Sequence, residues 1–512
     1  MVESIYSRPN ESSAYKDRVR NSRPCYMHLE SLNRVARSRT SVRHRGGIPS
    51  PPEYRQKQFL LLHHYQDRQR PGHKYTHKDY IHIAASHFLL KPSIPIKSIS
   101  RKKIRPIAGI GDKERIMKYT VFMKKTLVQW GAGNIGRGLI GRIFATHQWN
   151  VHFIDVDRQL LQALRREGSY TVTCVDEHTR ESIVVTPAHL VDGNDSKAVV
   201  GSIVRCDLLS LSVGKHVLPH IVPLLAEGLV ARWEIDPERT LDIILAENVL
   251  NGAQMMEDLI RGHLPKEYPL DTLAGFIQAS IGTMVPLRDR SKSLEIDVEP
   301  YKQLFLDKDR FKGKIPDFPE ISAVSPIEAY MDRKLFMHNL GHAAAAYIGH
   351  LRHPEAIHLC DVLKDREVFE AVQNAMEEGS DLLLSLYPET FTKEDLLEHR
   401  EDLLKRFQNP VLKDTVYRVG RDLKRKLSFD DRLLGAMLKA ERQGTSYRAI
   451  AEAYASALRF DARDEKGTLY GDDEEFFRQT RDLSVRERIL FASGLTKEEF
   501  PSGLLQTIES FY

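Results

Sequence analysis

Short apolar runs alternate with longer amphipathic stretches through the middle of the chain. Residues 126–130 and 151–155 form two such runs, and a helical pattern extends between them to about residue 147. The stretches "CDLLSLSVG" (206–214) and "LDIILAEN" (241–248) continue the arrangement, and each precedes another helical pattern. Strands that alternate with helices predict a doubly wound α/β sheet, whose ligands bind at the carboxyl ends of the strands.

A second pattern appears further along, in "KLFMHNLGHAAAAYIGH" (334–350). On a straight helix, at about 100° per residue, Lys334, Asn339 and His342 lie on one face and apolar residues lie on the opposite face. By itself this pattern is equally typical of an amphipathic helix whose polar face meets water. The segment therefore predicts a helix and leaves the role of its polar face open.

The formal charge is divided unevenly along the 512 residues. Residues 1–116 contain 24 Lys and Arg against 9 Asp and Glu, whereas the rest of the chain contains 51 against 61. The net charge of +5 therefore says little about the folded part. We expect no nucleic acid among its partners, because the positive charge is confined to the first fifth of the chain.

Residues 1–116 lack helical or alternating periodicity, so they are predicted to be a basic, disordered extension. A basic nucleic-acid arm and an organelle transit peptide are alternatives, although early acids such as Glu3 and Glu11 are unusual in a transit peptide. A third interpretation is that translation starts at Met117 or Met123. In that case residues 1–116 would be translated upstream DNA.

Cysteine usage and hydropathy predict the compartment. The four cysteines are widely separated and form no CxxC pair, which argues against a zinc cluster and favours a reducing compartment. No run of about 18 or more apolar residues occurs, so no transmembrane helix is predicted. We therefore expect a cytoplasmic protein that has no membrane partner and no metal site.

The stretch "TLVQWGAGNIGRGLIG" predicts a dinucleotide site. The glycines Gly131, Gly133 and Gly136 form GxGxxG between a strand and a helix, and Asp155 follows at the end of the next strand. Gly131 permits a tight turn, Gly133 admits a pyrophosphate, and Gly136 lets the helix and strand approach closely.

Asp155 favours NAD over NADP, because a carboxylate accepts hydrogen bonds from the ribose hydroxyls and repels a 2′-phosphate. The nearby Arg158 is a weak argument for NADP, because an arginine can accommodate that phosphate. The complete predicted cofactor-binding set is Gly131, Gly133, Asn134, Ile135, Gly136, Asp155, Val213 and Gly214.

Asn248 ends the strand of residues 241–248, at the edge where the chemistry would occur. An asparagine at that position is equally often a helix cap. Its position alone does not decide between the two roles.

Several ordered stretches between about 124 and 460 resemble the polyol-specific long-chain dehydrogenase/reductase family. They are "GAGNIGRGLIG", "AENVLNG", "LEIDVEPYKQLFLDKDRFKG", "RKLFMHNLGHAAAAYIGHL" and "RFQNPVLKDTVYRVGRDLKRKLSFDDRLLG". The resemblance implies a Rossmann-like N-terminal catalytic domain at 124–314 and a mainly α-helical C-terminal domain at 315–512. It also implies a metal-independent NAD enzyme that interconverts a sugar alcohol phosphate and a ketose phosphate.

The resemblance assigns roles to the polar face of the 334–350 helix, through the family signature K-x4-N-x2-H. Lys334 is expected to be the general base, while Asn339 and Asn248 hold the developing alkoxide and His342 orients the substrate and the lysine. A free lysine, with a pKa of about 10.4, is a poor base at neutral pH. Burial and the positive nicotinamide would both lower that pKa.

The phosphate end is predicted from "TVYRVGRDLKRKLSFDDR". Arg418 and Lys426 occupy family-matching positions, and Arg421 lies between them. Arginine can hold a phosphate bidentately and lysine can act as a point charge. A solvated charged face balanced by nearby aspartates is the alternative.

One departure affects the substrate. Relatives in the family usually carry Val-Asp-Arg-Ile-x-Pro where this chain has "GFIQASIGTMVPL", so Gly282 and Thr283 replace the Asp-Arg pair. That pair lies near the substrate in the family, so its absence leaves the exact polyol open. A uronate reductase of the same superfamily, acting on tagaturonate or fructuronate, is the alternative. A catalytically silent NAD-binding regulator is a further alternative. The sequence leaves the oligomeric state open, and a monomer is compatible with it.

Overall fold

The computed structural model describes residues 124–176, 179–247, 249, 251–284 and 294–512. The predictions made for residues 1–116 and for Asn248 lie outside the described residues.

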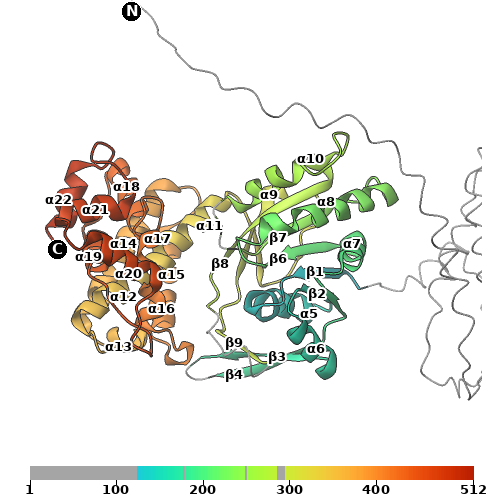
Figure 1. Ribbon diagram of the computed structural model, residues 1–512, viewed down its shortest axis with the longest axis horizontal. Helices are drawn as coiled ribbons and strands as arrows, with labels where there is room; N and C mark the ends of the chain where they lie inside the picture. Colours follow the sequence, from blue (N-terminus) through green and yellow to red (C-terminus); the bar gives the residue numbers. More distant parts are fainter. Residues whose placement is uncertain (1–123, 177–178, 248, 250, 285–293) are drawn as a thin grey trace, which may run out of the picture. The chain divides into compact units, whose positions relative to one another are not determined.

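A sheet forms the centre of the N-terminal domain (Figure 1). It has eight strands in the order β11-β10-β8-β7-β6-β1-β2-β5. The six strands from β8 to β5 in that order are parallel, and β10 is antiparallel to β8. The strands are β1 (Thr126–Trp130), β2 (Asn150–Asp155), β5 (His189–Asp192), β6 (Leu208–Leu211), β7 (Leu241–Leu245), β8 (Ala274–Ile281), β10 (Leu304–Asp307) and β11 (Ile321–Val324).

Both faces of this sheet are covered, as a doubly wound fold requires. Leu127 and Val128 are adjacent in β1, yet they belong to two different buried clusters because alternate side chains point to opposite faces. Val199, Leu225 and Met256 pack on the Val128 side. The prediction of a doubly wound α/β sheet is confirmed.

The helices of this domain follow the strands, as the periodicity predicted. They are η1 (Gly136–Gly141), α5 (Arg142–Thr146), α6 (Arg158–Glu167), α7 (Ser196–Arg205), α8 (Leu218–Ile235), α9 (Gly252–Arg261), α10 (Leu270–Leu273) and the short η2 (Lys308–Arg310). A three-stranded sheet has the order β4-β3-β9, with β3 (Tyr170–Val175), β4 (Arg180–Val185) and β9 (Ile296–Val298).

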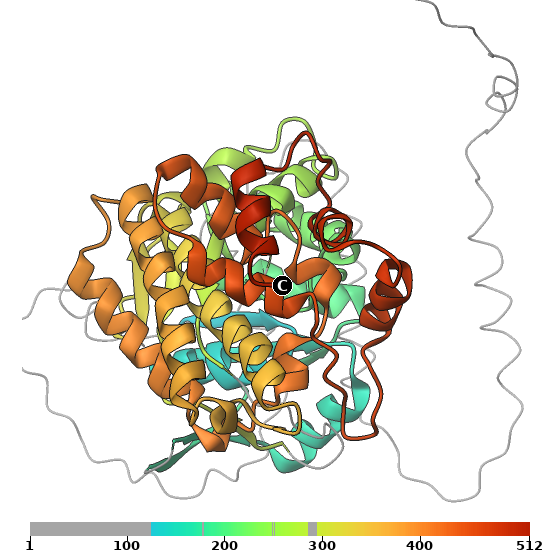
Figure 2. The same ribbon diagram turned by 90° about the vertical axis from the view of Figure 1, so that its left-hand side faces the viewer.

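The described chain after β11 is helical, which confirms the expected mainly α-helical C-terminal domain (Figure 2). Its helices are α11 (Ile327–Arg333), η3 (Lys334–Asn339), α12 (Leu340–Arg352), α13 (Leu359–Val362), α14 (Arg366–Leu386), α15 (Lys393–Phe407), η4 (Pro410–Leu412), α16 (Val416–Gly420), α17 (Leu423–Lys426), α18 (Leu434–Gln443), α19 (Arg448–Ala457), α20 (Gly471–Thr480), α21 (Val485–Ser493) and α22 (Ser502–Glu509).

Helix α12 lies at the centre of the helical core. The four alanines Ala343 to Ala346 are all fully buried, and α12 packs against α14, α16 and α19. Small side chains let neighbouring helices approach α12 closely. The alanine run therefore marks the most enclosed helix of the domain, and this helix begins directly after the Lys334 segment.

Helix α11 carries the helical domain to the carboxyl edge of the sheet (Figure 1). The Ser280 hydroxyl, near the end of β8, donates a 3.1 Å hydrogen bond to the carbonyl of Tyr330 in α11. Lys334 follows Tyr330 by about one helical turn. Helix α11, which leads into the Lys334 segment, is thus attached near the carboxyl end of β8.

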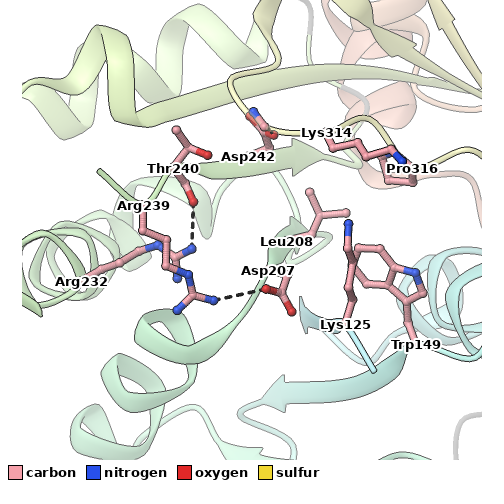
Figure 3. Close-up of a pocket in the computed structure, with 11 residues that line it drawn as sticks. Lys125, Trp149, Asp207, Leu208, Arg232, Arg239, Thr240, Asp242, Lys314 and Pro316 are labelled. Atoms are coloured by element: carbon pink, nitrogen blue, oxygen red, sulfur yellow. Dashed lines mark hydrogen bonds and ion pairs between the residues drawn. The ribbon is translucent and has the colours of Figure 1, made fainter. Parts of the chain in front are cut away.

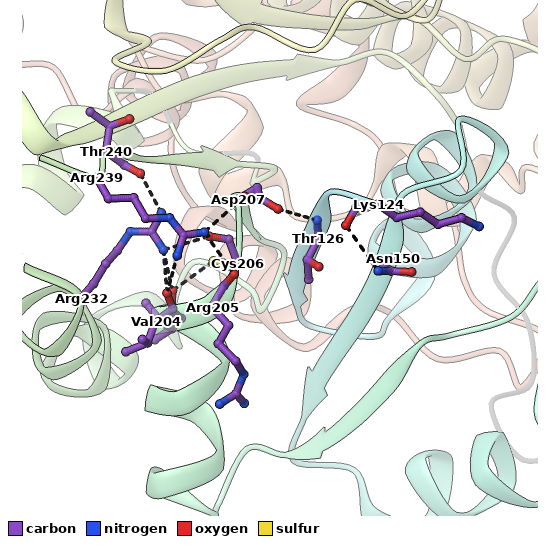
Figure 4. Close-up of polar contacts among 11 residues, drawn as sticks. Lys124, Thr126, Asn150, Val204, Arg205, Cys206, Asp207, Arg232, Arg239 and Thr240 are labelled. Atoms are coloured by element: carbon purple, nitrogen blue, oxygen red, sulfur yellow. Dashed lines mark hydrogen bonds and ion pairs between the residues drawn. The ribbon is translucent and has the colours of Figure 1, made fainter. Parts of the chain in front are cut away.

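The opposite, amino edge of the sheet is fastened by two arginines (Figure 4). Arg232 donates hydrogen bonds to carbonyls at the end of α7, including Val204 at 2.8 Å, and to Thr240 at 2.8 Å. Arg239 binds the same helix end and also the carboxylate of Asp207. These cations satisfy carbonyls that a helix C-terminus leaves without partners.

None of the described helices is long and apolar enough to cross a membrane.

Candidate active site

The turn after β1 has the shape that a dinucleotide requires. Gly131 has φ +96°, and a Cβ there would lie 2.1 Å from the carbonyl oxygen of Ser212. A Cβ on Gly136 would lie 2.0 Å from the carbonyl oxygen of Gly131. Gly133 differs, because nothing lies within 4 Å of its Cβ position and the residue is exposed. Two glycines are therefore needed for packing, and the third leaves room for a ligand.

The helix after this turn begins at Asn134 and Ile135, next to the exposed Gly133. The first N–H groups of a helix lack intrahelical acceptors and carry partial positive charge, so they suit a pyrophosphate. Residues Gly136–Gly141 form a π-helical segment within this helix. The turn and the helix start together fit the phosphates of NAD.

Asp155 ends β2 beside the glycine turn. One carboxylate oxygen accepts the backbone N–H of Ala132 at 2.6 Å, and the other accepts that of Asp157 at 2.9 Å. These bonds fix the carboxylate at the end of the strand. Arg158 is directed elsewhere, because its Nε binds the carboxylate of Asp192 at 2.8 Å.

Val213 and Gly214 follow β6 at the same edge. The N–H of Gly214 donates to the carboxylate of Glu247, which follows β7. Burial raises the pKa of the Glu247 carboxyl, and the backbone hydrogen bonds oppose that shift. Glu247 therefore joins the loops after two neighbouring strands of the predicted cofactor site.

The Lys334 segment is not a straight α-helix, so that expectation is wrong for its first six residues. Lys334–Asn339 is π-helical and lies between the α-helices α11 and α12. A π-turn inserts an extra residue and rotates the side chains that precede it relative to those that follow. Such bulges occur frequently at functional sites. The angles expected for Lys334 relative to His342 on a uniform helix therefore do not apply.

The electrostatic environment of Lys334 favours the neutral amine. Burial, and secondarily the positive charge of Arg432, lower the pKa of Lys334 to about 8. A water-exposed lysine would remain almost entirely protonated at this pH. Lys334 can thus exist as the neutral amine under mildly alkaline conditions.

Asn339 ends the π-helical segment and is partly buried. Within the part of the chain that the structure describes, its carboxamide makes no hydrogen bond. Most partly buried amides have a hydrogen-bond partner, so Asn339 is kept as a candidate for contact with a ligand.

His342 lies in the first turn of α12 and is held by two neighbours. Its ring stacks on Phe407 with centroids 4.7 Å apart and planes within 4°. Its Nε2 lies 3.1 Å from the carboxylate of Asp414, although the orientation is not that of a hydrogen bond. Burial and the cations around it, Arg418 first, lower the pKa of His342 far below its usual range. The imidazole is therefore neutral at physiological pH.

The cations proposed for a phosphate are gathered around helices α16 and α17, near His342. Arg418 is ion-paired with Asp414, the same carboxylate that lies beside His342. The Lys426 ammonium is buried and donates to the carbonyl oxygens of Val419, at 2.6 Å, and Arg421. Burial lowers the pKa of Lys426 to about 7.

Arg421 is arranged differently. Its guanidinium lies over the rings of Tyr417 and Tyr470, 5.5 Å and 5.3 Å from their centroids. The structure thus brings Arg418 and Lys426 towards His342, and it places Arg421 on an aromatic surface.

Two neighbours of the site were not singled out from the sequence. Arg432 influences the pKa values of both Lys334 and His342, and its Nε binds Asp431 at 2.7 Å. Asp414 lies between His342 and Arg418. Both residues occur in the stretch "RFQNPVLKDTVYRVGRDLKRKLSFDDRLLG", which resembles the family. That resemblance is the sequence feature that could have identified them.

The Gly282 and Thr283 positions, where the chain departs from the family pattern, lie just after β8. The Thr283 hydroxyl donates a 3.0 Å hydrogen bond to the carbonyl of Tyr301, and the carbonyl of Gly282 accepts one of 2.6 Å from Arg406. Arg406 belongs to α15, so a cation from the helical domain reaches this position.

A cavity of about 210 Å³ opens at the amino edge of the sheet, away from the glycine turn (Figure 3). Its acids are engaged by the protein itself: Asp242 accepts the N–H groups of Lys312 and Gly313, and Asp207 accepts that of Thr126. We attribute these contacts to holding the loops at this edge. The cavity is not part of the candidate active site.

Among the described residues, no group of three or more His, Cys, Asp and Glu side chains is placed to hold a metal ion.

Comparisons with known proteins identify the family of both domains. Residues 125–320 match the family described as the mannitol dehydrogenase Rossmann domain, and residues 326–509 match the mannitol dehydrogenase C-terminal domain. A mannitol-1-phosphate 5-dehydrogenase of Lacticaseibacillus casei is 34% identical over 328 residues, which cover 64% of this chain and 85% of that protein. An enzyme of the same name from Lactiplantibacillus plantarum is 30% identical over 371 residues, which cover 71% of this chain and 95% of that protein.

Solved structures show the same fold. A D-sorbitol dehydrogenase in substrate-free form superposes with a TM-score of 0.62 at 17% identity, covering 75% of this chain and 92% of that one. The mannitol 2-dehydrogenase of Pseudomonas fluorescens, in a ternary complex with NAD and D-mannitol, superposes with a TM-score of 0.58 at 15% identity. The match covers 76% of this chain and 92% of that one. The family resemblance inferred from the sequence motifs is confirmed.

Proposed function

This chain belongs to the mannitol dehydrogenase family and is an NAD-dependent polyol dehydrogenase, and from that premise we propose that it interconverts a sugar alcohol phosphate and a ketose phosphate. The pair we propose is of the mannitol 1-phosphate and fructose 6-phosphate type. The observation that carries the proposal is the group of cations beside His342, on the helical domain of a chain whose curated relatives are named for a phosphorylated polyol.

Lys334 is the proposed general base. A base is most effective when its pKa lies near the working pH, and the pKa of Lys334 is lowered to about 8. In the oxidation direction the neutral amine takes the proton of the substrate hydroxyl. NAD, when bound, supplies the hydride acceptor, and the glycine turn and Asp155 are the residues that would hold it.

Two carboxamides are proposed to stabilise the oxygen as negative charge develops. Asn339 offers an amide group without a partner among the described residues, and Asn248 remains part of the proposal from its place after β7. Amide donors carry no formal charge, so they stabilise an oxyanion without further lowering the pKa of Lys334. A donor of this kind typically contributes about 3 kcal/mol to the transition state.

His342 is proposed to orient the substrate and the lysine. Because its imidazole is neutral, it can donate a hydrogen bond from one nitrogen and accept one at the other. Its ring is fixed by the face of Phe407, which limits rotation.

The phosphate would be held by the cations at α16 and α17. Arg418 is the first candidate, because its guanidinium is charged and partly exposed and lies next to the His342 group. Lys426 is proposed as the second, although its ammonium also binds two carbonyl groups. Arg421 is the third member of the predicted set. No metal is needed in this proposal, because the amine and amides supply the proton acceptor and the oxygen donors.

A substrate panel with NADH tests the proposal. We expect fructose 6-phosphate to be reduced with a kcat/KM at least about 100-fold above that for unphosphorylated fructose, because charged hydrogen bonds to phosphate contribute about 1.5–3 kcal/mol each. NADH oxidation is followed in the absorbance of the reduced nicotinamide, with NADPH as the cofactor control.

Each alternative has its own outcome in that panel. Activity with tagaturonate or fructuronate and none with fructose 6-phosphate would replace the proposal by a uronate reductase. NADH binding without turnover of any polyol, ketose phosphate or uronate would instead favour a silent regulator.

A further inference from the structure

An ion pair joins the helical domain to the Rossmann-like domain. Arg406, near the end of α15, binds Glu299, which directly follows β9. Its Nε lies 2.7 Å from one carboxylate oxygen, and its Nη2 lies 2.6 Å from the other. Glu299 is 1% exposed and Arg406 is 9% exposed. The pair is therefore bidentate and almost completely shielded from water.

The same guanidinium also fixes the end of β8. Its Nη2 donates to the carbonyl of Gly282 at 2.6 Å, and its central carbon lies 4.2 Å from the centroid of the Tyr301 ring. A Cβ on Gly282 would come within 3.1 Å of that ring, so the glycine leaves space for the contact between Tyr301 and Arg406. The carboxylate of Glu299 additionally accepts the N–H of Met284. Arg406 and Glu299 thus hold Gly282 and Met284, just after β8, at the carboxyl edge of the sheet.

The next residue of α15 contacts the candidate catalytic imidazole. Phe407 stacks face to face on His342, and its ring centroid lies 5.7 Å from that of His338. Two consecutive residues of one helix therefore contact the cofactor domain and the imidazole. A displacement of Arg406 would move Phe407 with it, because both belong to the same helical turn.

A purely stabilising role explains this geometry poorly. A buried ion pair gives little net stability, since desolvation of the two charges offsets their attraction. Its advantage is directional, because a bidentate pair together with a hydrogen bond to the Gly282 carbonyl restricts the relative positions of its partners. That directional constraint acts between the sheet edge and the helix that supports His342.

We propose that Arg406 and Phe407 are positioning residues that align His342 with the carboxyl edge of the sheet, with Glu299 and Gly282 as the anchor on the cofactor domain. The inference rests on the proposed role of His342 in turnover. It adds a specific route by which the two domains fix the geometry of the site. A misplacement of about 1 Å can lower a catalysed rate by about 100-fold.

Two substitutions test it. Arg406→Lys keeps the charge and loses the bidentate pair, and Phe407→Leu keeps an apolar side chain and loses the ring stack. We expect each to lower kcat by about 10- to 100-fold while the Kd for NADH changes less than about twofold. If Arg406 and Phe407 position His342 together, the effects of the two substitutions will not add. The double variant will then lower kcat no further than the more damaging single variant.

Arg400→Gln is the matched control. Arg400 lies in the same helix, is buried, and pairs at 3.2 Å with Glu377 of α14, inside the helical domain. The Arg400→Gln substitution should lower the melting temperature, as the other two substitutions do. It should leave kcat within about twofold of the parent value, because the ion pair that it removes lies inside the helical domain.

The assay uses the full chain and whichever ketose substrate the unsubstituted protein reduces fastest. Folded Arg406→Lys and Phe407→Leu proteins with kcat within twofold of the parent would overturn the inference and leave the proposed function intact. If the parent turns over uronates only, the proposed substrate fails and the positioning effect is still measured. A variant that does not fold is replaced by the other, since either one alone decides the outcome.

Discussion

At the scale of single residues, the proposed turnover depends on the protonation of one amine. Lys334 has a pKa of about 8 because its side chain is removed from water and because Arg432 is close. The sequence identified Lys334 through a motif, but it did not identify Arg432 as a neighbour. The two residues are almost a hundred positions apart in the sequence, and their electrostatic interaction depends on how the helices pack.

The rate of polyol oxidation should therefore follow the titration of Lys334. Only the neutral amine accepts a proton, so kcat should increase as the pH rises through about 8 and become constant above it. Ketose reduction requires the protonated amine and should decrease over the same interval. Steady-state rates between pH 6 and 10 in both directions measure this, and a midpoint near that of free lysine would contradict it.

Removal of the neighbouring cation should move that midpoint. In Arg432→Met the positive charge that disfavours the lysinium ion is lost, so the oxidation midpoint should shift to higher pH. Arg442→Met, which removes an exposed arginine of α18, is the control and should leave the midpoint unchanged. An identical profile for both variants would show that Arg432 does not act on Lys334.

At the scale of elements, strands and helices were predictable and their irregularities were not. The apolar run at 126–130 and the glycine fingerprint located β1 and the following turn correctly, because they depend on local periodicity and on steric demands. The two π-helical segments, Gly136–Gly141 and Lys334–Asn339, gave no signal in the periodicity. An extra residue in a helical turn is stabilised by tertiary contacts, which a single sequence does not report.

The glycine turn gives a prediction at this scale. In Gly136→Ala the new Cβ would come within 2.0 Å of the Gly131 carbonyl oxygen, so the helix must move away from β1. Overpacking of this kind costs about 1–3 kcal/mol, and we expect the affinity for NADH to fall by at least about tenfold. Gly471→Ala is the control, because nothing lies within 4 Å of its Cβ position. Equal NADH affinities in a titration of the two variants would argue against a cofactor at this turn.

Helices α16 and α17 give a second prediction at the scale of elements. Arg418→Ala should raise KM for a phosphorylated ketose by about 10- to 100-fold, because a charged hydrogen bond to phosphate is lost. The KM for NADH should not change. Lys424→Ala, which removes an exposed cation of α17, serves as the comparison. If the Arg418 and Lys424 variants behave alike, the phosphate lies elsewhere.

At the scale of the whole molecule, the proposed site draws on residues of both domains. In this proposal the sheet contributes the glycine turn and Asp155, and the helical domain contributes Lys334, Asn339 and His342. The motifs predicted both groups of residues. They did not reveal the contacts that align them, such as the Arg406–Glu299 pair between residues 107 positions apart. Those contacts depend on the packing of α15 against the sheet edge.

The central claim is that Lys334 is the base for NAD-dependent turnover. Its most direct test is a comparison of Lys334→Met with the unsubstituted protein, measuring kcat for ketose reduction together with the Kd for NADH. We predict that kcat falls by at least about 10³-fold while the Kd for NADH stays within about twofold, because the amine acts on the substrate and not on the cofactor. A folded Lys334→Met protein that retains more than about a tenth of the parent kcat would contradict the claim.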